Sequence, residues 1–151
     1  MTDNAYGNAV FVDDTAFKAF MDPTHGQHGR ARSFFLDLDD LERDFVSTSY
    51  IVFDTHEWLS NHYGPGPAEA FLGAVEQAMT MGKLSLISGN DQLEREARNL
   101  LAGCPQLGLT FAEAVTSVVI LAYRINRLFT FNRSFAALAE LQPALRLLPS
   151  R

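Results

Sequence analysis

Hydrophobic positions along the chain form short continuous runs that alternate with longer stretches of helical spacing. The run 9–12 is β-branched and aromatic and ends in two aspartates, which predicts a buried strand with acids at its carboxyl end. The stretch 111–125 is apolar on nearly every side of a helix, so we expect a buried helix there. A second β-branched and aromatic run, 127–131, stops at the polar Asn132 and predicts another strand.

The remaining pattern continues this alternation of strands and helices. Further strands are predicted at 45–48, 83–88 and 146–149. Further helices are predicted around 17–21 and over 31–44, 49–63, 69–81, 91–101 and 135–141, with the Gly-Pro-Gly-Pro run 64–67 as a break. In the helix over 31–44, the expected inward side chains are Phe34, Phe35, Leu38 and Leu41. The alternation predicts an α/β fold with a mainly parallel sheet, in one domain spanning 1–151.

Composition and charge narrow the class of protein. The chain has 151 residues, 47% of them hydrophobic, which suffices for a real core. Its longest apolar run, 118–123, is too short to span a membrane, and the first ten residues lack the features of a signal peptide. One cysteine, Cys104, excludes an internal disulfide, so we expect a cytoplasmic protein. The net charge of −6 argues against broad adhesion to nucleic acid, but it is compatible with a nuclease whose acids hold a divalent cation.

Four polar residues are placed where chemistry can collect. Asp13 and Asn132 follow predicted strands, and the carboxyl ends of strands in open α/β sheets are where ligands bind. Glu113 opens the buried helix. Asp54 lies in mid-helix, where aspartate is a poor helix former, and helical spacing places it beside the inward face.

If the carboxylates of Asp13, Asp54 and Glu113 converge, they repel one another unless a cation offsets their charge. Oxygen ligands without histidine or thiol favour Mg²⁺ or Mn²⁺ over zinc. Each residue also has a simpler interpretation. Glu113 completes a capping box with Thr110, Asn132 and Asp13 can each cap a helix, and Asp54 can be an acid at a helix flank.

Four short motifs, in this order along the chain, resemble those of the PIN-domain ribonucleases, and within them the VapC-like toxins. The motifs are VFVDDTAFKAFMDP, STSYIVFDTHEWL, LTFAEAVTSVVI and LFTFNRSF, and the likeness covers nearly the whole chain. Asp54 stands where the family usually has glutamate, Glu113 where it has aspartate, and Asn132 where an aspartate is common.

The resemblance implies a three-layer α/β/α fold and Mg²⁺-dependent cleavage of RNA. It implies Asp13, Asp54 and Glu113 as metal-binding carboxylates, and Asn132 as a neutral fourth ligand or water-positioning group. It offers Arg133 and Arg127 as contacts to substrate phosphate. Because Asn132 removes a charge, the alternative is a degenerate, non-catalytic PIN-like binding module.

The resemblance also implies partners. A cognate antitoxin would clamp an apolar groove near the two early helices. The groove is expected at Phe17, Phe20, Phe34 and Phe35. A homodimer is expected as well.

Overall fold

The computed structural model describes residues 6–149 and contains one sheet of five parallel strands. The strands are β1 (Ala9–Val12), β2 (Asp44–Thr48), β3 (Leu84–Ile87), β4 (Arg127–Phe129) and β5 (Arg146–Leu148). Their order across the sheet is β3-β2-β1-β4-β5. The predicted α/β class and the parallel sheet are thus confirmed.

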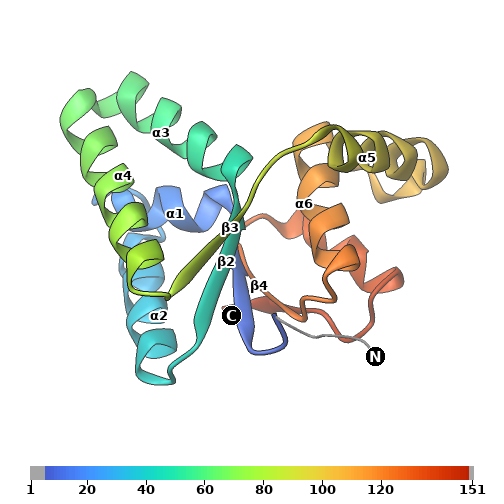
Figure 1. Cartoon of the computed structure of the whole chain (residues 1–151), viewed down its shortest axis with the longest axis horizontal. Helices are drawn as coiled ribbons and strands as arrows, with labels where there is room; N and C mark the ends of the chain where they lie inside the picture. The colour runs from blue at the N-terminus through green and yellow to red at the C-terminus, as the bar shows by residue number, and fades with distance from the viewer. Residues whose placement is uncertain (1–5, 150–151) are drawn as a thin grey trace.

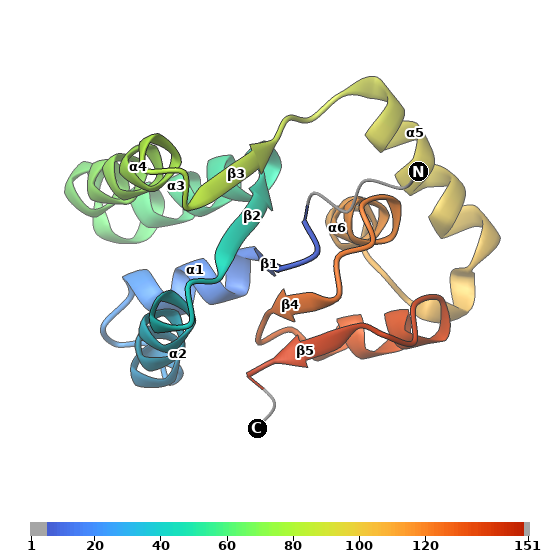
Figure 2. The same ribbon diagram turned by 60° about the horizontal axis from the view of Figure 1, so that its bottom comes forward.

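Helices cover both faces of this sheet and give three layers (Figure 1). The α-helices are α1 (Asp14–Met21), α2 (His28–Asp40), α3 (Ser49–Tyr63), α4 (Pro65–Thr80), α5 (Asp91–Gly103) and α6 (Phe111–Ala122). Two 3₁₀ helices, η1 (Pro105–Leu107) and η2 (Arg133–Glu140), complete the described chain. Helices α1 to α4 gather on one side of the sheet and α5 and α6 on the other, as the turned view also shows (Figure 2). None of the helices within 6–149 is long and apolar enough to cross a membrane.

The core lies where β1, β4 and α6 meet. All four residues of β1 are buried, as expected for a central parallel strand that is covered on both faces. In α6, seven consecutive residues from Ala114 to Ile120 are buried, which confirms the prediction of a buried helix.

The strand order reverses at β1. The chain steps outward from β1 through β2 to β3, and then returns to the other side of β1 for β4 and β5. In open α/β sheets, the crevice at the carboxyl ends of such neighbouring strands is the usual ligand site. Val12 pairs with Phe129, so the residues directly after β1 and β4 begin that crevice side by side.

Some element boundaries differ from the predictions. Helix α2 ends at Asp40, and Leu41, expected inside, is 66% exposed because the chain reverses through Glu42 with a φ of 57°. Helix α4 begins directly at Pro65, since proline is well suited to the first turn, and Gly64 alone makes the break with a φ of 87°. Strand β4 ends two residues early, and the helix expected at 135–141 is the 3₁₀ helix η2.

Candidate functional site

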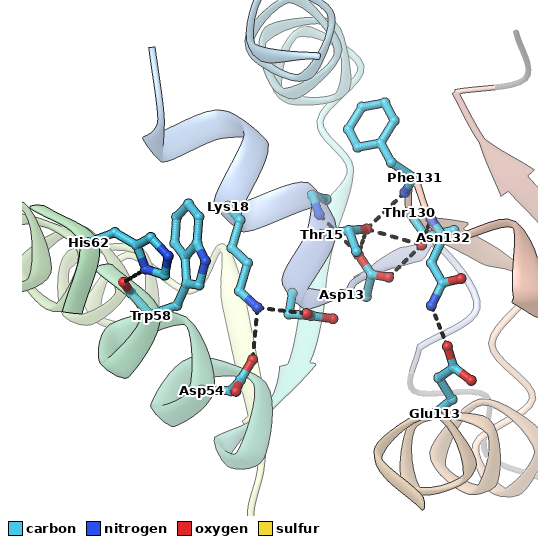
Figure 3. Close-up of polar contacts among 12 residues, drawn as sticks. Asp13, Thr15, Lys18, Asp54, Trp58, His62, Glu113, Thr130, Phe131 and Asn132 are labelled. Atoms are coloured by element: carbon cyan, nitrogen blue, oxygen red, sulfur yellow. Dashed lines mark hydrogen bonds and ion pairs between the residues drawn. The ribbon is translucent and has the colours of Figure 1, made fainter. Parts of the chain in front are cut away.

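A cleft opens at the reversal point, where the starts of α1, α3 and α6 face the turn after β4. Its volume is about 330 Å³. The cleft wall includes four acidic or amide side chains, namely Asp14, Asp54, Glu113 and Asn132. We call this feature the acid cleft; Figure 3 shows the residues around it.

Asp13 lies directly behind this wall and is 1% exposed. Its Oδ1 accepts hydrogen bonds from Thr15 Oγ1 at 2.6 Å and from the Ala16 backbone N–H at 3.0 Å, so Asp13 caps α1. Its Oδ2 accepts a hydrogen bond from the Thr130 hydroxyl. Burial raises the pKa of Asp13 to about 6, although these hydrogen bonds act in the opposite direction.

The same hydroxyls tie the end of β1 to the turn after β4. Thr15 Oγ1 accepts from the Phe131 N–H at 2.9 Å, and Thr130 Oγ1 accepts from the Asn132 N–H at 2.8 Å. Asp13 thereby fixes the backbone that presents Asn132 to the cleft (Figure 3).

Glu113 and Asn132 form a direct pair. Glu113 Oε1 accepts from the Thr110 N–H at 2.9 Å in the capping box, and its Oε2 accepts from Asn132 Nδ2 at 2.6 Å. Asn132 Oδ1 accepts from the Ser134 N–H at 3.0 Å and caps η2. The simpler capping interpretations are therefore correct for these residues, and they coexist with a place on the cleft wall.

Asp54 agrees with its simpler interpretation, an acid at the flank of a helix. The buried residues of α3 are Ile51, Val52, Thr55 and Leu59. Asp54 lies at the edge of that face rather than beside the core, and its side chain is 58% exposed. It still lines the acid cleft, where its Oδ2 accepts a hydrogen bond from Lys18 Nζ at 3.0 Å.

Lys18 joins Asp54 to Asp14. Its Nζ also donates to Asp14 Oδ2 at 3.0 Å, and its side chain is 19% exposed. Burial alone would lower the pKa of Lys18, but the hydrogen bonds and charges of Asp14 and Asp54 raise it above its ordinary value.

The acid cleft can be tested for its fit to a divalent cation. Its polar wall consists of carboxylate, hydroxyl and amide groups, and no thiol or imidazole is among its lining residues in the described chain. This donor set fits Mg²⁺ or Mn²⁺. Within 6–149, however, no three acidic, histidine or cysteine side chains are grouped closely enough to hold an ion as they stand. Asp13, Asp54 and Glu113 surround the cleft region without meeting at one point.

The two arginines proposed as phosphate contacts lie in different places. Arg133 lines a small cleft beside the acid cleft, together with Arg30 and Asn132. Arg127 begins β4, at the end of the strand away from Asn132, and its Nη1 donates to the Gly7 carbonyl at 3.3 Å. Its position gives it a structural contact and does not bring it to the acid cleft.

Sequence reasoning missed Asp14, Lys18 and the two threonines of the network. The i, i+4 spacing of Asp14 and Lys18 is a recognisable ion-pair signal on a helix. Thr15 and Thr130 carry no comparable signal, because their roles depend on the pairing of β1 with β4.

Comparison with known proteins gives structural matches only. No protein-family model matches the chain, and no curated protein sequence does. The structure of Mycobacterium tuberculosis VapC20, described as a sarcin-ricin loop cleaving toxin, has a TM-score of 0.69 and 18% identity, covering 85% of this chain and 93% of that one. The structure of VapBC2 from Rickettsia felis, bound to a DNA fragment from their promoter, has a TM-score of 0.62 and 12% identity, covering 92% and 96%. The chain therefore has the three-layer α/β/α, PIN-like fold of these VapC structures.

Proposed function

We propose that the chain is a divalent-metal-dependent endoribonuclease, the toxin of a toxin–antitoxin pair, and that the acid cleft is its active site. The observation that carries this proposal is the gathering of Asp14, Asp54, Glu113 and Asn132 at the reversal point of a VapC-like sheet. The similar VapC20 is described as a sarcin-ricin loop cleaving toxin, which supports RNA as the substrate class.

Mg²⁺ or Mn²⁺ would be held by Glu113 and Asn132, with Asp54, Asp14 and Asp13 supplying further negative charge. Such an ion, when bound, activates water for attack on a phosphodiester and offsets charge on the phosphate oxygens. Asp13 acts through its hydrogen bonds to Thr15 and Thr130, which hold Asn132 in place.

The small cleft beside Asn132 supports a contact to the RNA backbone. Nη2 of Arg30 is buried there and has no hydrogen-bond acceptor among residues 6–149. Arg133 is exposed in the same cleft. Guanidinium groups are well suited to phosphate oxygens, so we propose Arg133 and Arg30 as phosphate contacts.

The test is cleavage of mixed-sequence RNA by the wild type and by Asp13→Asn and Glu113→Gln, with Mg²⁺, with Mn²⁺ and with EDTA. We expect cleavage that requires metal and that falls by 100-fold or more in both variants. Asp39→Asn is the matched control, because Asp39 is an exposed acid on α2 that pairs with Lys83 instead. Circular dichroism checks that each variant is folded.

The alternative is a non-catalytic binding module, and two contacts favour it. The amide of Asn132 already donates to one oxygen of Glu113, and the ammonium of Lys18 already offsets one of the two charges of Asp14 and Asp54, so part of the negative charge of the cleft is compensated without a metal. If the wild type stays inert on RNA at millimolar Mg²⁺ and Mn²⁺, the binding-module function replaces the nuclease.

A second, apolar groove supports an antitoxin partner. It lies among α1, α2, β2, α4 and β3; its walls include Phe17, Phe20, Phe35, Phe71 and Ala74. We call it the apolar groove. Of the residues expected there, Phe34 is absent because it packs edge-on against Phe129, with ring centroids 4.8 Å apart.

An exposed apolar groove of this kind fits the hydrophobic face of an amphipathic helix. We propose that an antitoxin helix occupies it; the similar Rickettsia felis structure is of VapBC2 on a DNA fragment from their promoter. We also propose a homodimer acting in the cytoplasm. Light scattering should give twice the chain mass of 16.8 kDa, and a monomer across micromolar concentrations would contradict the dimer.

A further inference from the structure

The ammonium group of Lys18 is held firmly at one side of the acid cleft. Its Nζ lies 3.0 Å from Asp14 Oδ2 and 3.0 Å from Asp54 Oδ2, which come from different helices. The same Nζ lies 5.6 Å from the centroid of the Trp58 ring, within the range of a cation–π interaction. Figure 3 shows Lys18 extended between the Trp58 ring and Asp54.

This arrangement divides the acid cleft into two halves. On one side, Lys18 bridges Asp14 and Asp54, whereas on the other side Glu113 has an uncharged partner, Asn132. Among residues 6–149, Lys18 is the only lysine or arginine in a salt bridge with a carboxylate of the cleft wall; the one other described ion pair, Lys83 with Asp39 at 3.3 Å, lies elsewhere.

A cation held between two carboxylates competes with any second cation for the same oxygens. The side chains of Lys18 and Asp14 are 19% and 35% exposed, so bulk water screens their contact less than it screens a surface pair, whereas Asp54 is 58% exposed and its contact is screened more. For a divalent ion to bind both Asp14 and Asp54, it would have to displace the ammonium and leave it without its partners. Glu113 carries no such competitor in the described structure.

We propose that Lys18 is a built-in monovalent cation that fills the Asp14–Asp54 half of the acid cleft and excludes one divalent ion from it. A metal ion is then left only the half formed by Glu113 and Asn132. The inference rests on the proposed function for the identity of the metal. It adds a positioning residue, Lys18, that limits how many ions the cleft takes.

The test is the number of Mn²⁺ ions bound per chain, measured from the electron paramagnetic resonance signal of free Mn²⁺ at neutral pH. We expect Lys18→Met to bind one ion more than the wild type, because its acid pair becomes available. Lys18→Arg keeps the charge and should bind the same number as the wild type. Lys83→Met is the matched control, since it removes a lysine from an ion pair outside the cleft, and it too should leave the number unchanged.

Equal Mn²⁺ numbers for Lys18→Met and the wild type would overturn the inference. Lys18→Gln repeats the measurement if circular dichroism shows that Lys18→Met does not fold. Failure of the proposed function looks different: the wild type then binds no Mn²⁺ and cleaves no RNA. Even in that case, a single ion bound by Lys18→Met alone would support the exclusion by Lys18.

Discussion

At the scale of single residues, two features of the surroundings of Asp13 act on its pKa in opposite directions. Its carboxylate is buried, which disfavours the charged form, and it accepts three hydrogen bonds, which favour that form. The balance leaves its pKa at about 6, above the ordinary value of 3.8. Asp13 is therefore ionised at neutral pH at a cost to the stability of the fold.

This pKa predicts how stability depends on pH. Because the folded state binds the proton of Asp13 more tightly than the unfolded state, the stabilisation is complete below pH 3.8 and is lost as the pH rises through about 6. A shift of this size corresponds to about 3 kcal/mol in the free energy of unfolding. Asp13→Asn, which keeps an N-cap side chain, should therefore be more stable than the wild type at pH 7.5.

Urea unfolding in EDTA, from pH 7.5 to pH 4.5, measures this difference. The difference in the free energy of unfolding between Asp13→Asn and the wild type should shrink as the pH falls, because the wild type regains stability when Asp13 is protonated. Asp14→Asn serves as the control, because it removes the adjacent carboxylate, which is half-buried and paired with Lys18, and leaves Asp13 in place. Parallel pH profiles for Asp13→Asn and the wild type would show that Asp13 does not titrate in this range.

At the scale of elements, the junction of β3 and α5 depends on a close contact with the start of α3. Tyr50, at the start of α3, donates a hydrogen bond from its hydroxyl to Glu94 Oε2 at 2.7 Å. A Cβ atom on Gly89 would lie 2.3 Å from the Tyr50 ring, so only glycine allows this approach. Tyr50 also lines the acid cleft, and the contact therefore helps to shape it.

Gly89→Ala should lower the free energy of unfolding by about 1 kcal/mol, because the Tyr50 ring must move and lose its bond to Glu94. Gly73→Ala is the matched substitution: Gly73 lies within α4 with nothing within 4 Å of an added Cβ. It should raise stability by about 0.5–1 kcal/mol. Chemical denaturation measures both. In a Tyr50→Ala background the cost of Gly89→Ala should vanish, and a cost that persists would refute the contact.

Most elements were predictable from local pattern, and the exceptions have physical causes. β1 and α6 carry hydrophobic runs that tertiary packing reinforces, so both were predicted closely. The helix type of η2 was not predicted, because its spacing of apolar residues does not distinguish a 3₁₀ helix from an α-helix. Leu41 continues the apolar spacing of α2, yet the turn at Glu42 ends the helix before it.

At the scale of the whole molecule, the candidate site is assembled from segments far apart in the sequence. The rule that strand ends gather at one edge was sufficient to nominate Asp13 and Asn132. It could not show that Lys18 reaches Asp54, because that contact depends on how α1 packs against α3. Residue types and strand ends thus locate the cleft, whereas its charge balance requires the packed helices.

The apolar groove allows a test at the same scale. Ala74 is an exposed residue of α4 on the groove wall, so Ala74→Arg should block a helix without disturbing the core. Ala70→Arg, at an exposed position of the same helix that is not among the groove residues, is the control. We expect that a short reading frame immediately upstream of the gene encodes a DNA-binding antitoxin. When each variant is co-expressed with that protein, at least 10-fold less antitoxin should be recovered with Ala74→Arg than with Ala70→Arg. Equal amounts of antitoxin recovered with both variants would contradict the groove assignment.

The central claim, that the acid cleft cleaves RNA with a divalent ion, also predicts the effect of Asn132→Asp. Nδ2 of Asn132 lies 2.6 Å from Glu113 Oε2, so aspartate there would bring two carboxylates together. Their repulsion is relieved by a bound cation. The substitution should therefore tighten Mn²⁺ binding.

The most direct measurement follows Mn²⁺ occupancy and RNA cleavage together in one titration, for the wild type and for Asn132→Asp. We predict that cleavage rises with occupancy in both proteins, and that both curves move to at least 10-fold lower Mn²⁺ in Asn132→Asp. Cleavage in the absence of metal, or full occupancy without cleavage in both proteins, would contradict the claim.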